Sequence, residues 1–492
     1  MNARTATLAL ALAAAGAGFI AKPIATSGPA LRDFESYYAA GATWRYHGDA
    51  YGREVWRVER TVPGVVAARD EVLPFVGPPF GLPLWGALAQ LGWSGASAVW
   101  EAILALALGV LALGSLRLAG GRIDAFDVAA VLAFAAGFGP LTSGIALGQV
   151  AIVSCAAIVL TPLLLRQRYA FAPAAGALVA ALQPNLGIVL AARAYERRAW
   201  IAFAFALALA AGGSAVALAG SGGLGHYFEV LQAHSASERF IAIQTTIAAV
   251  ARGFGAPAGA SGALALAVAL GALGLLAWQF AARPYCADDR LTLACAALPL
   301  VLPFAHEHDF TIAFLPVVLA VRRARGAAWV AAAVASMLVA VDWLGLAQRP
   351  GGTLETVLLT TGAALGLAAL ARGPLRPYHY APLLVVAGVL GAAQFVSAHS
   401  LPTWPDALPA HFQLPPALGA AGAWQWEQVA SGVAGLDPHW ALLRALSLAG
   451  CALIWGVASV VLLASRTEVP TRESFTPRDK SRTPKKALQA LE

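Results

Sequence analysis

Apolar runs about as long as a bilayer is thick alternate with short polar stretches along most of the chain. The first run covers residues 5–20, and the longest polar stretch after it covers residues 27–71. Further runs lie near residues 76–92, 95–117, 127–140, 148–165, 171–191, 200–219, 258–281, 291–304, 309–321, 327–345, 353–371, 380–396 and 441–465. Since a helix crosses a bilayer with about 20 apolar residues, the pattern predicts an all-α polytopic membrane bundle of about 12–14 transmembrane or re-entrant helices.

Composition supports this class. The 492 residues are 59% hydrophobic and 12% charged, whereas soluble domains carry about 25% charged residues. The net charge of +7 is better explained by basic cytoplasmic loops than by a nucleic-acid partner, because no basic patch is interleaved with exposed aromatic residues. Membrane lipids are therefore expected partners, and nucleic acid is not.

The basic loops predict the orientation. Alternating crossings put four basic clusters on one side, which the positive-inside rule makes cytoplasmic. These clusters are Arg193 with Arg197 and Arg198, Arg322 with Arg323 and Arg325, Arg372 with Arg376, and the tail after Arg466. Two pairs, Arg117/Arg122 and Arg166/Arg168, would then lie outside. Either the rule fails there, or two of the runs between residues 76 and 191 do not cross.

The chain divides into two parts. Residues 1–465 are expected to form one membrane domain, with a first extracytoplasmic loop at about residues 25–75. Residues 466–492 are rich in Pro, Thr, Lys, Arg and Glu without a periodic apolar face, which predicts a disordered, basic cytoplasmic tail. The first run is interpreted as a membrane helix, with a cleaved signal peptide as the alternative. We expect a multi-pass protein of the inner or plasma membrane.

Asp33 is the leading candidate for chemistry. It follows the first apolar run, lies among aromatic residues, and has a second acid at Glu35. A carboxylate at a membrane surface is costly unless it is used. A carboxylate in an extracytoplasmic loop indicates a membrane enzyme with its site at the lipid–water boundary.

Residues 306–309 read His-Glu-His-Asp between two apolar runs. Consecutive ionisable residues at such a junction mark either a water-filled functional cavity or a polar cap at the lipid surface. His306 and His308 could face one pocket. We expect no metal here, and the four cysteines lack ligand spacing.

A third outer segment, residues 397–440, is rich in Pro and Trp. It is interpreted as an aromatic belt at the headgroups. The alternative is the wall of an acceptor groove, because tryptophan faces stack on sugar rings.

Several elements, in order, resemble glycosyltransferase family 87, whose members are polyprenyl-phosphomannose-dependent mannosyltransferases of GT-C architecture. Asp33 opens the stretch that resembles the family's first loop. The other similar elements are residues 76–83 (its Tyr-Pro-Pro segment), 147–150 (Gly-Gln-Val-Asn), 183–184 (Lys-Pro), 227–252 (a loop ending in Arg252) and 303–308 (Pro-x-x-x-His). The resemblance covers about residues 5–345, and the chain departs from the usual residues at Gly77, Ala151 and Gln183.

The resemblance implies an inverting transferase that moves a sugar, mannose in the family, from a polyprenyl-phosphate donor to an extracytoplasmic glycolipid or glycan. Asp33 would be the general base. Arg252, His306 and His308 would bind the donor phosphate, and no cofactor beyond the lipid-linked donor is expected. Candidate acceptor-binding residues are Glu35, Tyr38, Trp44, Arg45 and His47.

A transporter or flippase of a lipid-linked intermediate is the alternative. It would place ionisable residues near the bilayer midplane and show internal repeats. The charges of this chain instead gather at one membrane boundary, which favours an enzyme.

Overall fold

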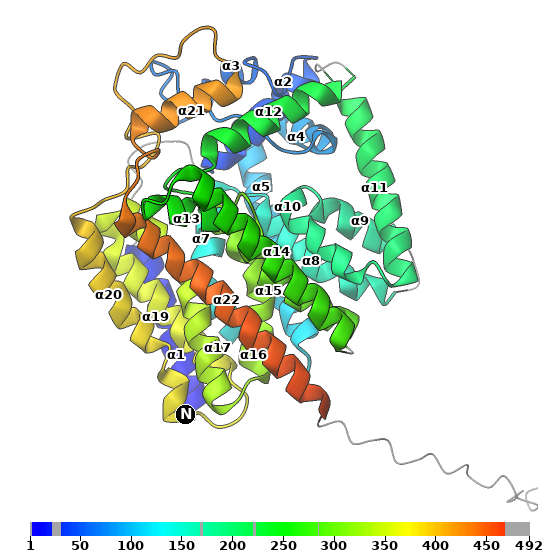
Figure 1. Ribbon diagram of the computed structural model, residues 1–492, viewed down its shortest axis with the longest axis vertical. Coiled ribbons are helices and arrows are strands. Elements are labelled where there is room, and N and C mark those ends of the chain that lie inside the picture. Colours follow the sequence, from blue (N-terminus) through cyan, green and yellow to red (C-terminus); the bar gives the residue numbers. More distant parts are fainter. Residues whose placement is uncertain (1, 22–30, 168–170, 220–222, 284, 468–492) are drawn as a thin grey trace, which may run out of the picture.

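The computed structural model describes residues 2–21, 31–167, 171–219, 223–283 and 285–467. Within these residues all regular secondary structure is helical, and no strand is present. The helices form a bundle roofed at one end by shorter helices (Figure 1). The expected all-α polytopic membrane bundle is confirmed. Of the predicted tail, Arg466 and Thr467 continue the last helix, and the remainder lies outside the described residues.

Seven described helices are long and apolar enough to cross a membrane. They are α1 (Ala3–Ala21), α5 (Gly92–Ala119), α11 (Arg197–Ala217), α14 (Ala258–Ala282), α19 (Thr353–Leu370), the stretch Pro377–Val396 that η6 (Pro377–Tyr380) and α20 (Leu383–Ser397) form together, and α22 (Pro438–Thr467). An eighth span is possible if α6 (Ala125–Ala136) and α7 (Gly139–Leu147) count together, although they meet at a 69° bend. Three shorter apolar helices accompany them: α8 (Ala151–Leu165), α9 (Phe171–Ala180) and α17 (Gly326–Ala340).

Short elements complete the bundle and its roof. Those within the bundle are α10 (Pro184–Gly187), η2 (Ile188–Arg193), α13 (Ile247–Gly253), α15 (Ala287–Ala297), η3 (Leu298–Leu300), η4 (Glu307–Ala313), α16 (Phe314–Arg323), α18 (Trp343–Gln348), η5 (Pro350–Gly352) and η6 (Pro377–Tyr380). The roof, called the cap here, comprises α2 (Arg32–Arg45), α3 (Val55–Glu59), η1 (Pro79–Gly81), α4 (Leu82–Ala89), α12 (Gly223–Glu238) and α21 (Ala420–Ser431).

The described residues contain seven or eight candidate spans, whereas about 12–14 transmembrane or re-entrant helices were expected. Most of the remaining apolar runs therefore form shorter helices. Several apolar runs are divided by Gly and Pro. Gly139 and Pro140 open α7 after the bend, and Pro184 opens α10. Because proline lacks the amide hydrogen that continues a helix, the chain turns at these points. The run at residues 76–92 gives only the short η1 and α4, and α4 has eight residues.

The structure corrects the expected position of the two basic pairs, Arg117/Arg122 and Arg166/Arg168, that strictly alternating crossings would put outside. Arg322 donates a hydrogen bond to the Arg122 carbonyl at 3.2 Å. Arg166 and Arg193 both pair with Asp288, each at 2.5 Å. Arg122 and Arg166 therefore lie at the same end of the bundle as the described basic clusters, opposite the cap (Figure 1), whereas Arg168 lies outside the described residues. This position agrees with the alternative in which two of the runs between residues 76 and 191 do not cross.

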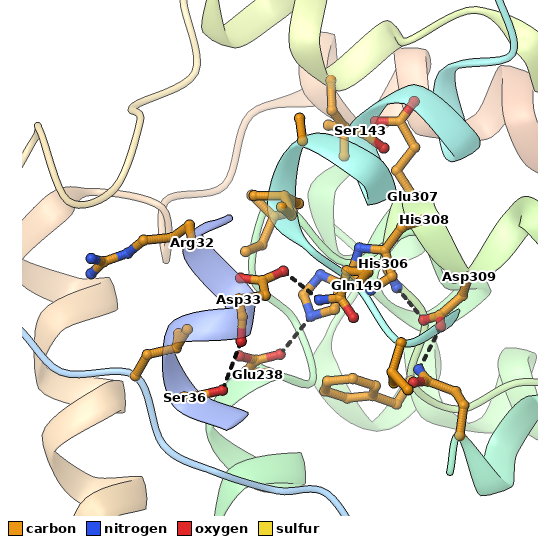
Figure 2. A pocket seen from close by; sticks show the side chains of 18 of the residues that line it. Arg32, Asp33, Ser36, Ser143, Gln149, Glu238, His306, Glu307, His308 and Asp309 are labelled. Atoms are coloured by element: carbon orange, nitrogen blue, oxygen red, sulfur yellow. Dashed lines mark hydrogen bonds and ion pairs between the residues drawn. The ribbon is translucent and has the colours of Figure 1, made fainter. Parts of the chain in front are cut away.

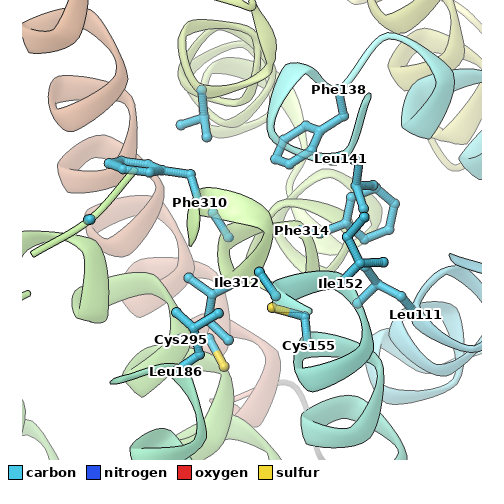
Figure 3. Packing of buried hydrophobic residues seen from close by; sticks show 14 of the residues in the cluster. Leu111, Phe138, Leu141, Ile152, Cys155, Leu186, Cys295, Phe310, Ile312 and Phe314 are labelled. Atoms are coloured by element: carbon cyan, nitrogen blue, oxygen red, sulfur yellow. The ribbon is translucent and has the colours of Figure 1, made fainter. Parts of the chain in front are cut away.

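A dense apolar core supports η4 from below. Phe314 contacts Phe134 and Phe138, each with ring centroids 5.5 Å apart. Leu141 of α7, Cys155 of α8 and other buried side chains fill the space around it (Figure 3). Aromatic pairs of this kind contribute about 0.5–1.5 kcal/mol each beyond their burial. This packing holds η4, and with it His306 and His308, against the cap.

Candidate active site

Asp33 lies in the first turn of α2 and faces a cavity of about 750 Å³ beneath the cap. This volume lies within the range of small-molecule sites, roughly 300–1,000 Å³. Burial raises the pKa of Asp33, while a hydrogen bond from Gln149 and the charge of His306 oppose that rise. The carboxyl group is thus held in a semi-enclosed site where its protonation depends on its neighbours.

Gln149 positions the Asp33 carboxylate. Its Nε2 donates a hydrogen bond to Asp33 Oδ2, across 116 residues of sequence. Gly148 makes this contact possible, because it ends α7 with φ +74° and a β-carbon there would lie 2.8 Å from that of Phe34. Only glycine adopts such a conformation without strain. The Gly-Gln pair singled out in the sequence therefore orients the candidate base.

His306 and Glu238 form an ion pair beside Asp33 (Figure 2). His306 Nε2 lies 3.1 Å from Glu238 Oε2. Burial alone would lower the pKa of His306, but the Glu238 carboxylate outweighs it and raises the pKa to about 9. Burial likewise opposes ionisation of Glu238, yet His234 and His306 together lower its pKa to about 2. Both groups are therefore charged at neutral pH.

Glu238 also joins two helices of the cap. Trp424 Nε1 donates a hydrogen bond to Glu238 Oε1, and Gln428 Nε2 donates to the same oxygen at 3.2 Å. Gln244 Nε2 donates to Glu238 Oε2 at 2.9 Å. Helices α12 and α21 thus meet at this carboxylate, which orients the imidazolium of His306.

His308 and Asp309 differ in chemistry from His306. The His308 ring stacks on that of His306, with centroids 5.4 Å apart. Burial and the neighbouring imidazolium keep the pKa of His308 well below its ordinary value. Asp309 accepts hydrogen bonds at 2.9 Å from Gln183 Nε2 and from the His306 backbone amide. His308 is therefore neutral, and Asp309 fixes the turn that presents both histidines.

A second group of charges lines the cavity beyond the histidines. Arg349 Nη2 pairs with Asp342 Oδ2 at 2.9 Å. Glu307 lines the same part of the cavity, and both burial and Asp342 raise its pKa. In Figure 2 Glu307 and Ser143 lie on the far side of the histidines from Arg32, whose guanidinium points away from His306. The cavity therefore has two polar ends, with Asp33 and His306 between them.

Of the four residues predicted as the base and the phosphate-binding group, three line the cavity and one does not. Asp33, His306 and His308 all line it. Arg252 lies outside the lining and donates a hydrogen bond to the carbonyl of Ala256 at 3.1 Å. The expectation that Arg252 joins the histidines is wrong. Arg252 lies in the last turn of α13, and its side chain bonds the backbone that follows the helix instead of reaching the cavity.

The predicted acceptor residues also lie outside the cavity lining. Glu35 is fully buried and bonds Arg32 at 2.8 Å. Tyr38 packs edge-on against Trp93, and Trp44 Nε1 donates to the Ala217 carbonyl at 2.9 Å. Arg45 and His47 are exposed at the end of α2. Because α2 turns every 3.6 residues, the positions beside Asp33 that reach the cavity are Ser36 and Tyr37 instead.

Other lining residues were not predicted as site residues. In the sequence, Glu238 is one acidic residue in a mixed polar segment, and no spacing pattern relates it to His306. Trp404 and Trp424 line the cavity, whereas Trp426 is half exposed. The Trp-rich segment therefore contributes Trp404 and Trp424 to the cavity wall and leaves Trp426 at the surface.

The fold and cavity define a polytopic helical membrane protein with a buried carboxylate–histidine site roofed by an amphipathic cap. A sequence model of glycosyltransferase family 87 matches residues 75–303. The match confirms the resemblance and supports membership of this chain in glycosyltransferase family 87, so the protein is a membrane glycosyltransferase. Comparison with the curated proteins and with the solved structures gave no match.

Proposed function

We propose that this protein transfers a sugar, mannose in the simplest case, from a polyprenyl-phosphate donor to a hydroxyl of an extracytoplasmic glycolipid or glycan, in a GT-C type architecture. The observation that supports this proposal is a single cavity in which Asp33 faces the His306–Glu238 ion pair. A base and a cation on opposite sides of a sugar are what an inverting transfer from a phosphate requires.

Asp33 is the proposed general base. The acceptor oxygen attacks C1 of the sugar while Asp33 takes the hydroxyl proton. The bond between C1 and the lipid-phosphate oxygen breaks, and the phosphate leaves with the electron pair. The hydrogen bond from Gln149 Nε2 holds the carboxylate in place for this transfer.

His306 and His308 are the proposed phosphate-binding residues. The imidazolium of His306 offsets the charge that develops on the departing phosphate. Neutral His308 can donate one hydrogen bond beside it. Arg349 replaces Arg252 as the arginine of this site, because it lines the cavity beyond the histidines, whereas Arg32 points the other way.

The lipid chain of the donor is proposed to lie between α7 and α19. This wall of the cavity contains Ala146, Leu359 and Thr360, and α19 is one of the helices that can cross a membrane. Exposing a polyprenyl chain to water would cost about 0.8 kcal/mol per CH₂. The donor therefore enters from the bilayer, and the acceptor enters from the side of Arg32, Trp404 and Trp424.

The basic end of the bundle is proposed to face the cytoplasm, which places the cap and cavity outside the inner or plasma membrane. The three described basic clusters, at residues 193–198, 322–325 and 372–376, lie at the end opposite the cap (Figure 1), which supports this orientation.

Donor use can be tested with purified protein in nanodiscs. Radiolabelled polyprenyl-phosphate sugars are supplied with extracted envelope glycolipids, and the same assay with nucleotide sugars is the control. We expect transfer from the lipid-linked donor and none from nucleotide sugars. Transfer from nucleotide sugars alone would contradict the proposed donor class. A flippase would move the labelled lipid across a vesicle bilayer without forming a new glycoside, and that outcome would replace the enzyme with the transporter alternative.

A further inference from the structure

We propose that His399, Asp437 and His439 form a binding site for a divalent transition-metal ion of the Zn²⁺ class. The site lies at the junction of α20 with α22, apart from the cavity. One ligand atom from each of the three residues lies within 4.8 Å of the others. No local spacing in the sequence indicates this site, because His399 is separated by a long segment from Asp437 and His439. The fold brings the two ends of that segment together, where Trp440 hydrogen bonds to His399 across 41 residues of sequence.

The donor set suits such an ion. Two imidazole nitrogens and one carboxylate oxygen are typical Zn²⁺ ligands, and the fourth position is then open to water. His439 Nδ1 lies 2.7 Å from Asp437 Oδ1, and His399 Nδ1 lies 3.9 Å from Asp437 Oδ2. Two ligand atoms that each lie about 2.0–2.2 Å from a tetrahedral ion are farther apart than 2.7 Å and closer together than 3.9 Å. Small side-chain rotations therefore suffice to bring all three onto one ion.

The surroundings hold the two histidines in place. Their rings are stacked with centroids 3.8 Å apart and an interplanar angle of 14°. The Phe395 ring packs against His439 with centroids 4.6 Å apart. Trp440 Nε1 donates a hydrogen bond to the His399 carbonyl at 2.8 Å. Two imidazoles are thus presented side by side to a carboxylate at a partly exposed position, where an ion can enter from solvent.

An ion here would join the two ends of the segment 398–437. Trp404, Trp424 and Val433 in this segment line the cavity, and Trp424 and Gln428 hold Glu238. Closing a long loop removes conformational freedom from its interior. The ion would therefore rigidify one cavity wall without touching the reacting groups, and the proposal does not depend on the identity of donor or acceptor.

Binding can be measured on tag-free, chelator-treated protein in detergent, by calorimetric titration with Zn²⁺ and by the visible absorption of Co²⁺. We expect one equivalent of either ion. His399→Ala and Asp437→Asn are expected to weaken binding at least about tenfold, the loss typical of a damaged metal site. His411→Ala is the matched control, since His411 is an exposed histidine of the same segment, and it is expected to bind as the wild type does.

A second measurement needs no variant. Zn²⁺ is expected to slow hydrogen exchange of wild-type residues 398–437 relative to the chelated protein. Absence of this protection would overturn the proposal, as would unchanged binding in both ligand variants. Loss of binding in His308→Ala, with normal binding in His399→Ala, would place the ion in the cavity and overturn it as well.

Discussion

His306 Nε2 lies 3.1 Å from Glu238 Oε2, although the two residues are 68 positions apart in the sequence. The contact joins η4, which rests on the apolar core, to α12, which belongs to the cap. It fixes a positive imidazolium opposite Asp33, so that one cavity holds a candidate base and a cation suited to a leaving phosphate.

Asp33→Asn is expected to lower the transfer rate at least about 100-fold, the range for loss of a general base. Asparagine keeps an oxygen that can accept the Gln149 hydrogen bond, so the fold should persist. Transfer rate and melting temperature are measured together. Asp49→Asn is the control, because Asp49 lies in the same loop outside the cavity lining and asparagine can still accept the hydrogen bond from the Tyr51 amide. Near-normal turnover in Asp33→Asn would exclude Asp33 as the base.

The rate of transfer is expected to follow a bell-shaped pH profile. Activity rises as Asp33 loses its proton, above the ordinary range of an aspartate because burial raises its pKa. It falls as His306 loses its charge, near the pKa of about 9 that Glu238 sustains.

Glu238→Gln tests the origin of the alkaline limb. Removing the carboxylate should move that limb down toward the ordinary histidine pKa of about 6.5. Glu229→Gln is the matched control on the same helix, where the Glu229 side chain is 80% exposed, and its profile should match the wild type. An alkaline limb that stays in place in Glu238→Gln would show that His306 does not carry it.

Gly148→Ala is expected to destabilise the protein by about 2–5 kcal/mol. A left-handed alanine costs about 1–2 kcal/mol, and the contact of its β-carbon with Phe34 at 2.8 Å adds an overpacking cost of about 1–3 kcal/mol. Activity should fall further than stability, because Gln149 follows directly. Denaturant titration in detergent measures the first effect. Gly109→Ala is the control, since nothing lies within 4 Å of its added carbon, and equal stability of the two variants would refute the argument.

Stability of the cap is expected to decrease as pH rises from about 5 to 8. Burial, with the carboxylates of Glu71 and Asp33, raises the pKa of Glu35 to about 8 against the opposing charge of Arg32. The native state therefore retains a proton that the unfolded chain releases, so unfolding becomes easier across this window.

Glu35→Gln cannot ionise, yet it keeps an acceptor for Arg32. It should reduce the loss of stability between pH 5 and 8, as measured by melting temperature. Glu54→Gln, at an exposed position of the first loop, should follow the wild-type curve. Parallel pH curves for the wild type and Glu35→Gln would show that this carboxyl group is not the cause.

Native Cys286 reports the proposed orientation without a new cysteine. It is exposed, whereas the other three cysteines are buried, and it lies beside Asp288 at the basic end. A membrane-impermeant maleimide should label the wild type only after permeabilisation. His47→Cys in a Cys286→Ser background should label in sealed cells, because His47 is exposed in the cap loop. Labelling of Cys286 in sealed cells would reverse the orientation.

The order of apolar and polar residues determined the class of the protein. Hydropathy is a local property, so the chain reveals its membrane helices and the polar loop that carries Asp33 without knowledge of contacts. The same holds for the Gly148–Gln149 pair and for His306 and His308, whose residue types are unusual in their apolar surroundings. The sequence could also predict that Asp33 and Glu35 face different directions, because residues two apart in a helix with 3.6 residues per turn lie on different faces.

Contacts between distant segments were decided only by the tertiary structure. No spacing rule links Glu238 to His306 or Asp33 to Gln149, since each pair is joined by the packing of whole helices. Packing also decided where the apolar runs bend, and it placed Arg122 beside Arg322 and Arg166 beside Arg193. Arg252 was predicted in the site from its position in the sequence, but its side chain bonds the Ala256 carbonyl and does not line the cavity. Residue type fixes what a side chain can do, and the fold alone fixes which side chains meet.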